Sequence, residues 1–271
     1  MIQLDIEEIR KIEIELLNHF KIFCREKGIQ FFLSNGTLLG AIKYRGFIPW
    51  DDDIDVFVPR KDYERLLIEF EDTEIYKLFS IERVHKFRFP FAKLCDMRTF
   101  KDESGVNNGI SLGIDIDIFP LDYFPNDFEQ AKKQINKTKR EILYLYYAKI
   151  NYGPGKNIAK TLIKNILIFI ARCVSAKRMI MKIERIADND GKYARSQFRG
   201  CAVWPMYNER EIVSSTIFEK EIEVEFEGEI FPAPIGYDEY LRSLYGDYKL
   251  DPPIEKQKSH HTFKAYKINN N

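Results

Sequence analysis

The chain has 271 residues, 45% of them hydrophobic and 31% charged, so it is long and apolar enough for one large domain or two small ones with a sizeable core. Its 42 basic and 42 acidic residues give a formal net charge of zero, which argues against a nucleic acid as the partner. Four scattered cysteines without a CxxC pair argue against a zinc finger or a disulfide framework and favour a reducing cytosol.

The amino-terminal segment, residues 4–27, is predicted to be an amphipathic helix, because its apolar side chains recur at helical spacing and Gly28 follows as a stop. Its charges argue against a secretory signal peptide. No stretch of the sequence approaches the roughly 18–20 uninterrupted apolar residues that a membrane span needs. We therefore expect a cytoplasmic protein.

The stretch from Phe31 to Arg60 joins a turn of small residues to an acidic cluster that leads into a strand. Its residues predict, in order, a buried strand at 29–33, a turn at 34–36, a short helix at 37–43, a loop at 46–49, a strand at 54–58 ended by Pro59, and a helix at 61–70. The acidic cluster runs from Asp51 to Asp55 and brings several carboxylates to one end of the second strand.

Asp53 and Asp55 stand at positions i and i+2, so in an extended segment their side chains point to the same face. Such a pair close to a glycine turn suits a magnesium ion that carries a phosphate ester. Gly36 allows the backbone to approach a ligand closely, and the hydroxyls of Ser34 and Thr37 can bind phosphate oxygens beside a helix N-terminus. The alternative is a solvated acidic loop next to an ordinary turn.

Residues 76–102 predict a hairpin or strand pair, and residues 114–119 predict a half-buried strand that Pro120 closes. In the second strand three isoleucines alternate with Asp115, Asp117 and Phe119, so the acids share the face that we expect to meet a polar cleft. A third carboxylate from this strand would complete a set able to hold two magnesium ions about 3.5–4 Å apart, a geometry for in-line attack at phosphorus.

The segment from 127 to 192 is predicted to be helical and is strongly basic, with 15 Lys and Arg against four Asp and Glu between residues 131 and 192. Gly153-Pro154-Gly155 divides it into two helical pieces, and the second, residues 158–186, has an apolar side. We expect a helical subdomain at about 127–200 with a solvated basic face. The alternative is that this face rests on an anionic membrane surface.

The carboxy-terminal part predicts a strand, turn and strand over residues 222–231 and a short helix at 237–245. A loop at 246–253 and a polar tail follow. The tail carries His260 and His261 and frays at residues 269–271.

Three groups of motifs closely resemble the signature of the LicD family. The first joins Ser34–Ala41 to Gly46–Asp55, the second is Ile116–Asp122, and the third comprises Tyr245–Tyr248, Pro252-Pro253 and His260-His261. Members of this family include bacterial phosphocholine transferases for lipopolysaccharide and teichoic acid, and eukaryotic fukutin and fukutin-related protein, which transfer ribitol phosphate to glycans. The resemblance covers most of the chain, and Asn35 departs from it where many members carry a second glycine or serine.

The resemblance implies an α+β, nucleotidyltransferase-like fold, with a mixed sheet flanked by helices in a single domain over residues 1–271 and a helical insertion. It implies an enzyme that depends on Mg²⁺, or on Mn²⁺, and moves a phospho-alcohol group, phosphocholine by default, from a CDP-linked donor to a sugar hydroxyl. The acceptor would be a cell-surface glycan such as lipopolysaccharide, teichoic acid or capsule, and CMP would leave. The alternatives are a nucleotidyltransferase that releases pyrophosphate and a non-catalytic glycan-binding protein.

Carried over by position, Asp53 and Asp55 are the expected metal ligands and Asp117 the third, with Asp115 as the alternative. Asp51 is an outer-shell group or a turn cap, and Asp52 on the other side hydrogen-bonds the backbone. The general base is His260 or His261, one of which could instead contact the donor phosphate, or it is a carboxylate of the metal site.

The expected substrate contacts come from the turn and from nearby basic residues. They are Ser34, Asn35, Gly36, Thr37, Lys43, Arg45 and Lys93. For Lys93 the alternative is a solvated lysine at a strand edge. Tyr44 and Trp50 either stack a cytosine or pack the loop, and packing is favoured for Trp50.

Overall fold

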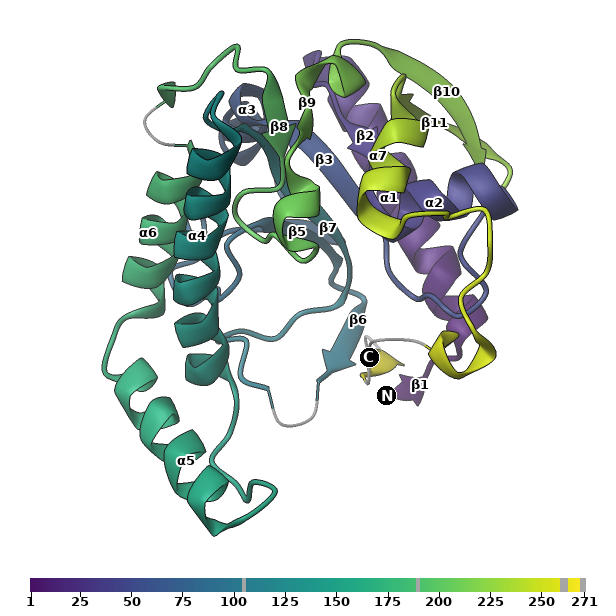
Figure 1. The fold of residues 1–271 in the computed structure, drawn as a ribbon. Helices are drawn as coiled ribbons and strands as arrows, with labels where there is room; N and C mark the ends of the chain where they lie inside the picture. The colour runs from purple at the N-terminus through teal and green to yellow at the C-terminus, as the bar shows by residue number, and fades with distance from the viewer. Residues whose placement is uncertain (104–105, 189–190, 259–262, 269–271) are drawn as a thin grey trace.

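The computed structural model describes residues 1–103, 106–188, 191–258 and 263–268 (Figure 1). At its centre is a seven-stranded mixed sheet with the strand order β2-β3-β7-β5-β4, to which β8 is added beside β7 and β9 beside β8. Among the strand pairs that the described residues form in this sheet, only β3 with β7 is parallel. The bounds of these strands are β2 Phe32–Leu33, β3 Asp55–Pro59, β4 Tyr76–Phe79, β5 Ala92–Asp96, β7 Ile114–Tyr123, β8 Phe198–Gly200 and β9 Val213–Ser214. Helices pack beside this sheet, so the predicted α+β class is confirmed.

Strand β7 is longer and more buried than its sequence pattern indicates. It continues through Pro120, which pairs with Val58 of β3, so the prediction that Pro120 closes the strand is wrong. Residues on both of its faces are buried, because α1, α3 and α6 all contact it. The half-buried strand expected at 114–119 is therefore a central strand, and its acids enter the interior of the protein.

The first helix, α1, spans Ile6–Lys27 as predicted. Asp5 caps it, since the Asp5 carboxylate accepts from the Glu8 N–H and the Glu8 carboxylate accepts from the Asp5 N–H. Gly28 ends the helix in the left-handed conformation, with φ of 60°, which glycine adopts without steric cost. The apolar stripe of the helix packs into the main core.

Helix α2 spans Asn35–Tyr44 and begins earlier than predicted, so the residues expected to form a turn are the start of the helix. Ser34 is the extended N-cap residue, and Arg45 ends the helix in the left-handed conformation. The next helix along the chain, α3, spans Arg60–Glu69 and follows β3 directly, close to the predicted 61–70.

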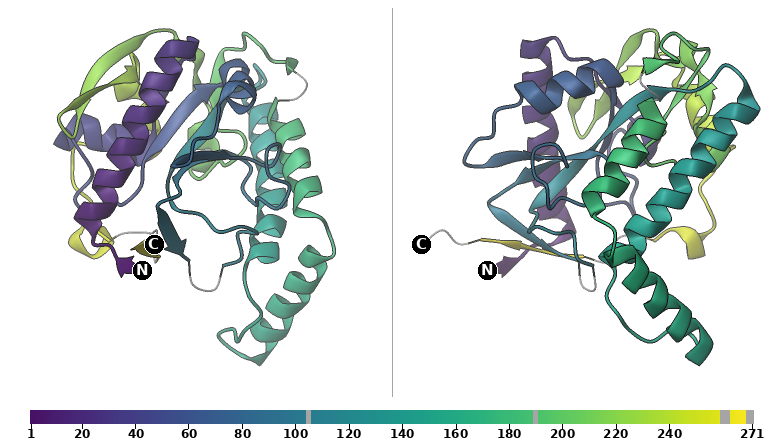
Figure 2. Two further views of the ribbon diagram at one scale, coloured as in Figure 1. Left: turned by 180° about the vertical axis from the view of Figure 1, so that it is seen from behind. Right: turned by 90° about the vertical axis from the view of Figure 1, so that its left-hand side faces the viewer.

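The basic segment forms three helices, α4 Phe128–Lys149, α5 Ile158–Arg172 and α6 Ala176–Asp188, so the expected continuous helix at 158–186 is wrong. The chain breaks between α5 and α6 because α6 turns back to pack along α4, and both helices contribute to the main core. Helix α5 instead extends beyond the rest of the molecule (Figure 2). Most of its apolar side is exposed, namely Leu162, Ile163, Ile166, Phe169 and Ile170.

The carboxy-terminal part completes two structures. Strands β10, Glu221–Phe226, and β11, Glu229–Pro234, form the predicted hairpin, and α7, Tyr237–Tyr245, is the predicted short helix. Near both termini a small separate sheet pairs β12, Lys264–Lys267, with β1, Ile2–Gln3, and β6, Thr99–Asp102, and the sequence pattern does not indicate this pairing. Short 3₁₀ helices lie at Asn208–Glu211, Ser215–Phe218 and Ile254–Lys256.

None of the described helices combines the length and the apolarity that crossing a bilayer requires. The predicted histidines, His260 and His261, and the fraying end at 269–271 lie outside the described residues.

Candidate active site

A cavity of about 250 Å³ brings together four of the acids that the sequence singles out. We call it the acid cavity. It is lined by Asn35, Gly36, Ile48, Asp51, Asp53, Asp55, Asp117, Phe119, Trp204, Met206, Tyr207 and Tyr245. The amino-terminal end of α2 and the paired strands β3 and β7 form one side, while residues after β8 and on α7 contribute the other.

The register of the sheet aligns the acids. Asp55 of β3 pairs with Asp117 of β7, and Asp117 pairs on its other side with Lys93 of β5. Directly paired residues of neighbouring strands point to the same face of a sheet, so three charged side chains lie side by side across three strands. Asp53 lies just before β3 and also lines the acid cavity, so it joins Asp55 and Asp117 there.

The start of α2 fixes the position of Asp55. The Asp55 N–H donates to Thr37 Oγ1 at 2.8 Å, and the Ser34 N–H donates to the Asp55 carbonyl at 3.1 Å. Asn35 hydrogen-bonds the Asp55 carboxyl group, and its Oδ1 accepts from the Tyr240 hydroxyl at 2.8 Å. Asn35 has φ of 45°, a left-handed conformation that asparagine tolerates better than most residues.

Only part of the predicted phosphate-binding turn lines the cavity. Asn35 and Gly36 do, and a Cβ at Gly36 would lie 2.6 Å from Asp51 Oδ2, so this close approach requires glycine. Ser34 and Thr37 are buried and are not among the lining residues. The Ser34 hydroxyl has no hydrogen-bond partner within the described part of the chain.

Burial and neighbouring negative charge disfavour the ionised forms of Asp55 and Asp117. Burial, together with the charges of Asp53, Asp117 and Asp51, raises the pKa of Asp55 well above its usual range. Burial also raises the pKa of Asp117, although the Lys93 ammonium opposes the shift. A bound divalent cation would favour the ionised form of both groups.

Lys93 and Asp115 form a buried ionic cluster beside this cavity. The Lys93 ammonium contacts Asp117 and lies 2.5 Å from Asp115 Oδ2, and Lys101 lies 2.5 Å from Asp115 Oδ1. Burial disfavours the Asp115 charge, but Lys101 and Lys93 outweigh it and hold the pKa of Asp115 at about 2. Lys93 is 5% exposed, so the alternative of a solvated strand-edge lysine is wrong.

The two acids of β7 therefore differ in surroundings. Asp117 lines the acid cavity with Asp53 and Asp55, whereas Asp115 is enclosed by two lysines and does not line it. Of the three acids in the loop before β3, Asp51 and Asp53 line the cavity, whereas Asp52 is buried and does not.

The donor set of the acid cavity fits a hard cation, because carboxylate oxygens are the ligands that Mg²⁺ prefers. Yet no three His, Cys, Asp or Glu side chains in residues 1–103, 106–188, 191–258 and 263–268 are gathered closely enough to form a finished metal site. Lys93 contacts one oxygen of Asp117 and offsets part of the negative charge. The residues thus suit a metal, while their side chains are not arranged as a closed coordination shell.

The structure does not bring Lys43 or Arg45 to the acid cavity. Lys43 Nζ lies 2.6 Å from Asp251 Oδ1 and donates to the Tyr248 carbonyl at 3.3 Å, so it lines a larger cavity next to this one. The Arg45 side chain is largely exposed and lies 3.7 Å from Glu225.

Arg10 of α1 is a positioning residue that the sequence does not reveal. Its Nη2 donates to the carbonyls of Ile48, Pro49 and Asp51 at 3.0, 3.2 and 2.6 Å and thereby ties down the loop that carries the acids. The partners lie 38–41 residues away, so no local signal marks this contact. Trp204 and Tyr207 are likewise brought to the cavity only by the tertiary structure, whereas Tyr245 belongs to the third motif singled out in the sequence.

Comparisons with known proteins agree with the motifs. The model of the LicD/FKTN/FKRP nucleotidyltransferase domain matches residues 28–150, which include α2, β3 and β7. The lipopolysaccharide cholinephosphotransferase LicD of Haemophilus influenzae is 31% identical over 277 residues, covering 98% of this chain and 99% of that protein. An uncharacterised protein of Rickettsia prowazekii is 37% identical over 49 residues, 17% of this chain and 18% of that protein.

Proposed function

The chain belongs to the LicD family and is a phosphotransferase, and we propose that it transfers phosphocholine from CDP-choline to a sugar hydroxyl of a cell-surface glycan and releases CMP. The acceptor named for the Haemophilus relative is lipopolysaccharide, and we adopt it as the first candidate, with teichoic acid and capsule as the others. The observation that carries the proposal is the alignment of Asp55 with Asp117 in one cavity with Asp53, within a chain similar to that enzyme over nearly its whole length.

The proposed cofactor is Mg²⁺ or Mn²⁺, held by Asp53, Asp55 and Asp117. When bound, such an ion neutralises phosphate oxygens and the leaving group. The chain's own contribution is to aim the three carboxylates at one space. Thr37 and Asn35 hold Asp55 in place, and Lys93 orients Asp117 through its contact with that carboxylate.

In the proposed reaction, the acceptor hydroxyl oxygen forms a bond to the phosphorus that bears choline. The bond from that phosphorus to the oxygen shared with CMP breaks, and CMP leaves with the electron pair. The hydroxyl proton passes to a base, either His260 or His261 or a carboxylate of the acid cavity. Lys93 offsets part of the negative charge of Asp117, which lowers the repulsion that an anionic donor meets at this cavity.

Product analysis tests this function. The protein is incubated with Mg²⁺, CDP-choline and lipopolysaccharide, and nucleotide products are separated by chromatography. We expect CMP and choline-bearing glycan in equal amounts, with neither formed when the acceptor is omitted. Pyrophosphate released from CTP in the presence of phosphocholine, without CMP from CDP-choline, would show instead that the enzyme is a nucleotidyltransferase.

Helix α5 supports a further part of the proposal, a peripheral contact with an anionic membrane surface that carries the acceptor. Its apolar side is exposed, with Leu162 at 61% and Phe169 at 63%. Between Glu141 and Glu184 the chain has eight Lys and Arg and no acidic residue. An exposed apolar stripe in a segment that carries cations and no acids matches the surface of a bilayer that contains anionic lipid.

A further inference from the structure

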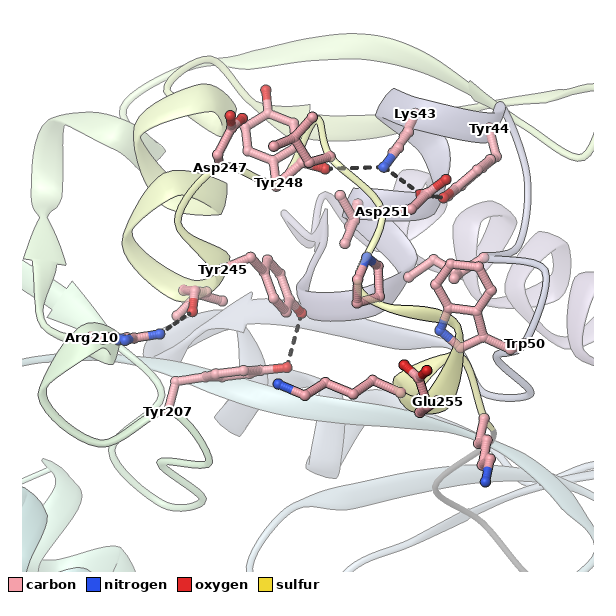
Figure 3. A pocket seen from close by; sticks show the side chains of 17 residues that line it. Lys43, Tyr44, Trp50, Tyr207, Arg210, Tyr245, Asp247, Tyr248, Asp251 and Glu255 are labelled. Atoms are coloured by element: carbon pink, nitrogen blue, oxygen red, sulfur yellow. Dashed lines mark hydrogen bonds and ion pairs between the residues drawn. The ribbon is translucent and has the colours of Figure 1, made fainter.

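A second cavity, of about 830 Å³, adjoins the acid cavity and shares with it Ile48, Tyr207 and Tyr245 (Figure 3). We call it the aromatic cavity. Its walls come from α2, the loop after α2, the segment at Tyr207–Arg210, α7, and residues 247–258. The three shared residues place the two cavities side by side.

Two pairs of aromatic rings lie on opposite sides of this cavity (Figure 3). Tyr44 and Trp50 contact edge to face, with ring centroids 6.4 Å apart and planes at 76°. Tyr207 and Tyr245 do the same at 5.1 Å and 76°, and the Tyr207 hydroxyl donates to the Tyr245 hydroxyl at 3.1 Å. The rings are thus held by their own contacts and offer a base preformed surfaces for stacking.

The wall formed by residues 247–258 is attached to α2 across the sequence. Lys43 and the Tyr44 hydroxyl both contact the Asp251 carboxylate, and Lys43 donates to the Tyr248 carbonyl (Figure 3). The cavity is therefore a built part of the fold and not a gap beside a loose tail.

The charges on the lining distinguish between the possible occupants. Four cationic side chains line the cavity against three carboxylates, and these seven are Lys43, Arg210, Lys256, Lys258, Asp247, Asp251 and Glu255. A surplus of cations disfavours the trimethylammonium group of choline and favours a ligand that carries a negatively charged phosphate chain. A neutral sugar carries no negative charge that could pair with the four cations. A flat base on a phosphate chain matches both the rings and the charge.

We propose that the aromatic cavity binds the pyrimidine nucleoside of the donor, with the base on the rings of Trp50 and Tyr245 and the phosphates directed toward the acid cavity. This inference rests on the proposed function, since it assigns a subsite to the same donor. It also implies that CDP and CMP, which lack the alcohol, bind through the same contacts as CDP-choline.

Calorimetric binding with CDP and CDP-choline tests the proposal in the wild type and in Trp50→Leu and Tyr245→Leu. Loss of one stacking ring is expected to raise the Kd of both ligands by the same factor, roughly 5- to 100-fold. Tyr245→Phe keeps the ring but removes the hydrogen bond to Tyr207, so it should raise the Kd of both ligands less than Tyr245→Leu does. The matched control is Tyr144→Leu, an exposed tyrosine on α4 outside both cavities, which should bind as the wild type does.

Three outcomes overturn the subsite. In the first, the leucine variants raise the Kd of CDP-choline but not that of CDP, which places the alcohol in the cavity. In the second, both leucine variants bind both ligands as the wild type does. In the third, Tyr144→Leu loses as much affinity as the leucine variants in the cavity. Thermal unfolding identifies any leucine variant that fails to fold. Tyr44→Leu is then used in the binding measurements in place of that variant.

Failure of the proposed function gives a different pattern. Suppose that CDP binds tightly and both leucine variants weaken this binding, but no CMP is released from CDP-choline in the presence of acceptor. The phosphotransfer proposal is then wrong and the subsite stands. If both leucine variants release CMP normally and keep the wild-type KM for CDP-choline, the subsite is wrong and the proposed function stands.

Discussion

Asp55 and Asp117 stand opposite each other on the parallel strands β3 and β7, although 61 residues separate them along the chain. The parallel register alone places their carboxyl groups on one face at one level of the sheet. Lys93 stands opposite Asp117 on β5, so the same level of the sheet carries two acids and one buried cation. The proposed chemistry depends on this alignment.

Asp55→Asn and Asp117→Asn are each expected to lower kcat for transfer about 100- to 1,000-fold, the loss typical of one electrostatic group at a transition state. The Asp55 carboxylate is already disfavoured by burial and by neighbouring acids, so Asp55→Asn should leave the melting temperature unchanged or raise it. Steady-state kinetics and thermal unfolding measure the two effects. Asp102→Asn, an exposed acid on β6, is the control, and full activity in either variant would contradict the proposed metal site.

Asp115 is expected to matter for stability more than Asp117. Asp115→Asn leaves two buried ammonium groups, Lys93 and Lys101, without their shared carboxylate, which should cost about 3 kcal/mol of unfolding free energy. Asp117→Asn removes a partly exposed acid that raises the pKa of Asp55, so its cost should be smaller. Urea unfolding at pH 7 compares the two, and a larger loss in Asp117→Asn would be contrary to the structure.

Acid titration isolates the same cluster. The pKa of Asp115 is about 2 in the folded protein and 3.8 ordinarily, so the unfolded chain binds the proton more readily. Its stabilising contribution is therefore present above about pH 4 and is lost as the pH falls toward 2, by roughly 2 kcal/mol. The unfolding free energy of the wild type should fall over this window more steeply than that of Asp115→Asn. Parallel curves would show that the two lysines do not depress the pKa.

The structure shows which parts of the protein local sequence patterns can predict. Helix α1 and the hairpin of β10 and β11 were predictable because spacing, caps and alternation are properties of neighbouring residues. The length of β7 and the break after α5 were not, because partners far away in the sequence decide them. Strand β12 likewise exists through its pairing with β1 and β6.

The candidate site divides in the same way. Asp53, Asp55 and Asp117 could be singled out because they lie in compact motifs at strand ends. The surroundings of Asp115 depend on the register of β5 against β7, which places Lys93 within reach of both β7 acids. The contacts of Arg10 with the acidic loop depend on how α1 packs, and no local pattern encodes them.

Glu211 gives the unfolding free energy a pH dependence opposite in sign to that of Asp115. Burial raises the pKa of this carboxyl to about 8 from an ordinary 4.5, so the folded protein binds the proton more tightly than the unfolded chain does. Stability should be greatest below about pH 4.5 with respect to this group and should decline as the pH rises toward 8. Glu211→Gln removes the ionisation. The unfolding free energy of this variant relative to the wild type should therefore be roughly 2–4 kcal/mol higher at pH 8 than at pH 5. Urea unfolding at both pH values measures this, and an equal difference in the wild type and the variant would refute it.

Exchange of two exposed apolar residues on α5 tests the membrane contact. The wild type is expected to float with vesicles that contain anionic lipid at low salt and to remain unbound with neutral vesicles. Leu162→Glu combined with Phe169→Glu should abolish flotation, because it puts charge into the apolar stripe and lowers the positive charge of the segment. Since both side chains are exposed, the melting temperature should change little.

The matched control for α5 is Ile68→Glu, which places the same charge at an isoleucine of α3 that is 82% exposed and lies outside the basic segment. This variant should float as the wild type does, because α3 is not part of the surface assigned to the bilayer. Raising the salt concentration should weaken flotation of the wild type and of Ile68→Glu, since exposed charges are screened within about 10 Å at 0.1 M. If the wild type ignores anionic vesicles at low salt, or if Ile68→Glu loses binding as completely as the α5 variant, the apolar side of α5 does not dock on a membrane.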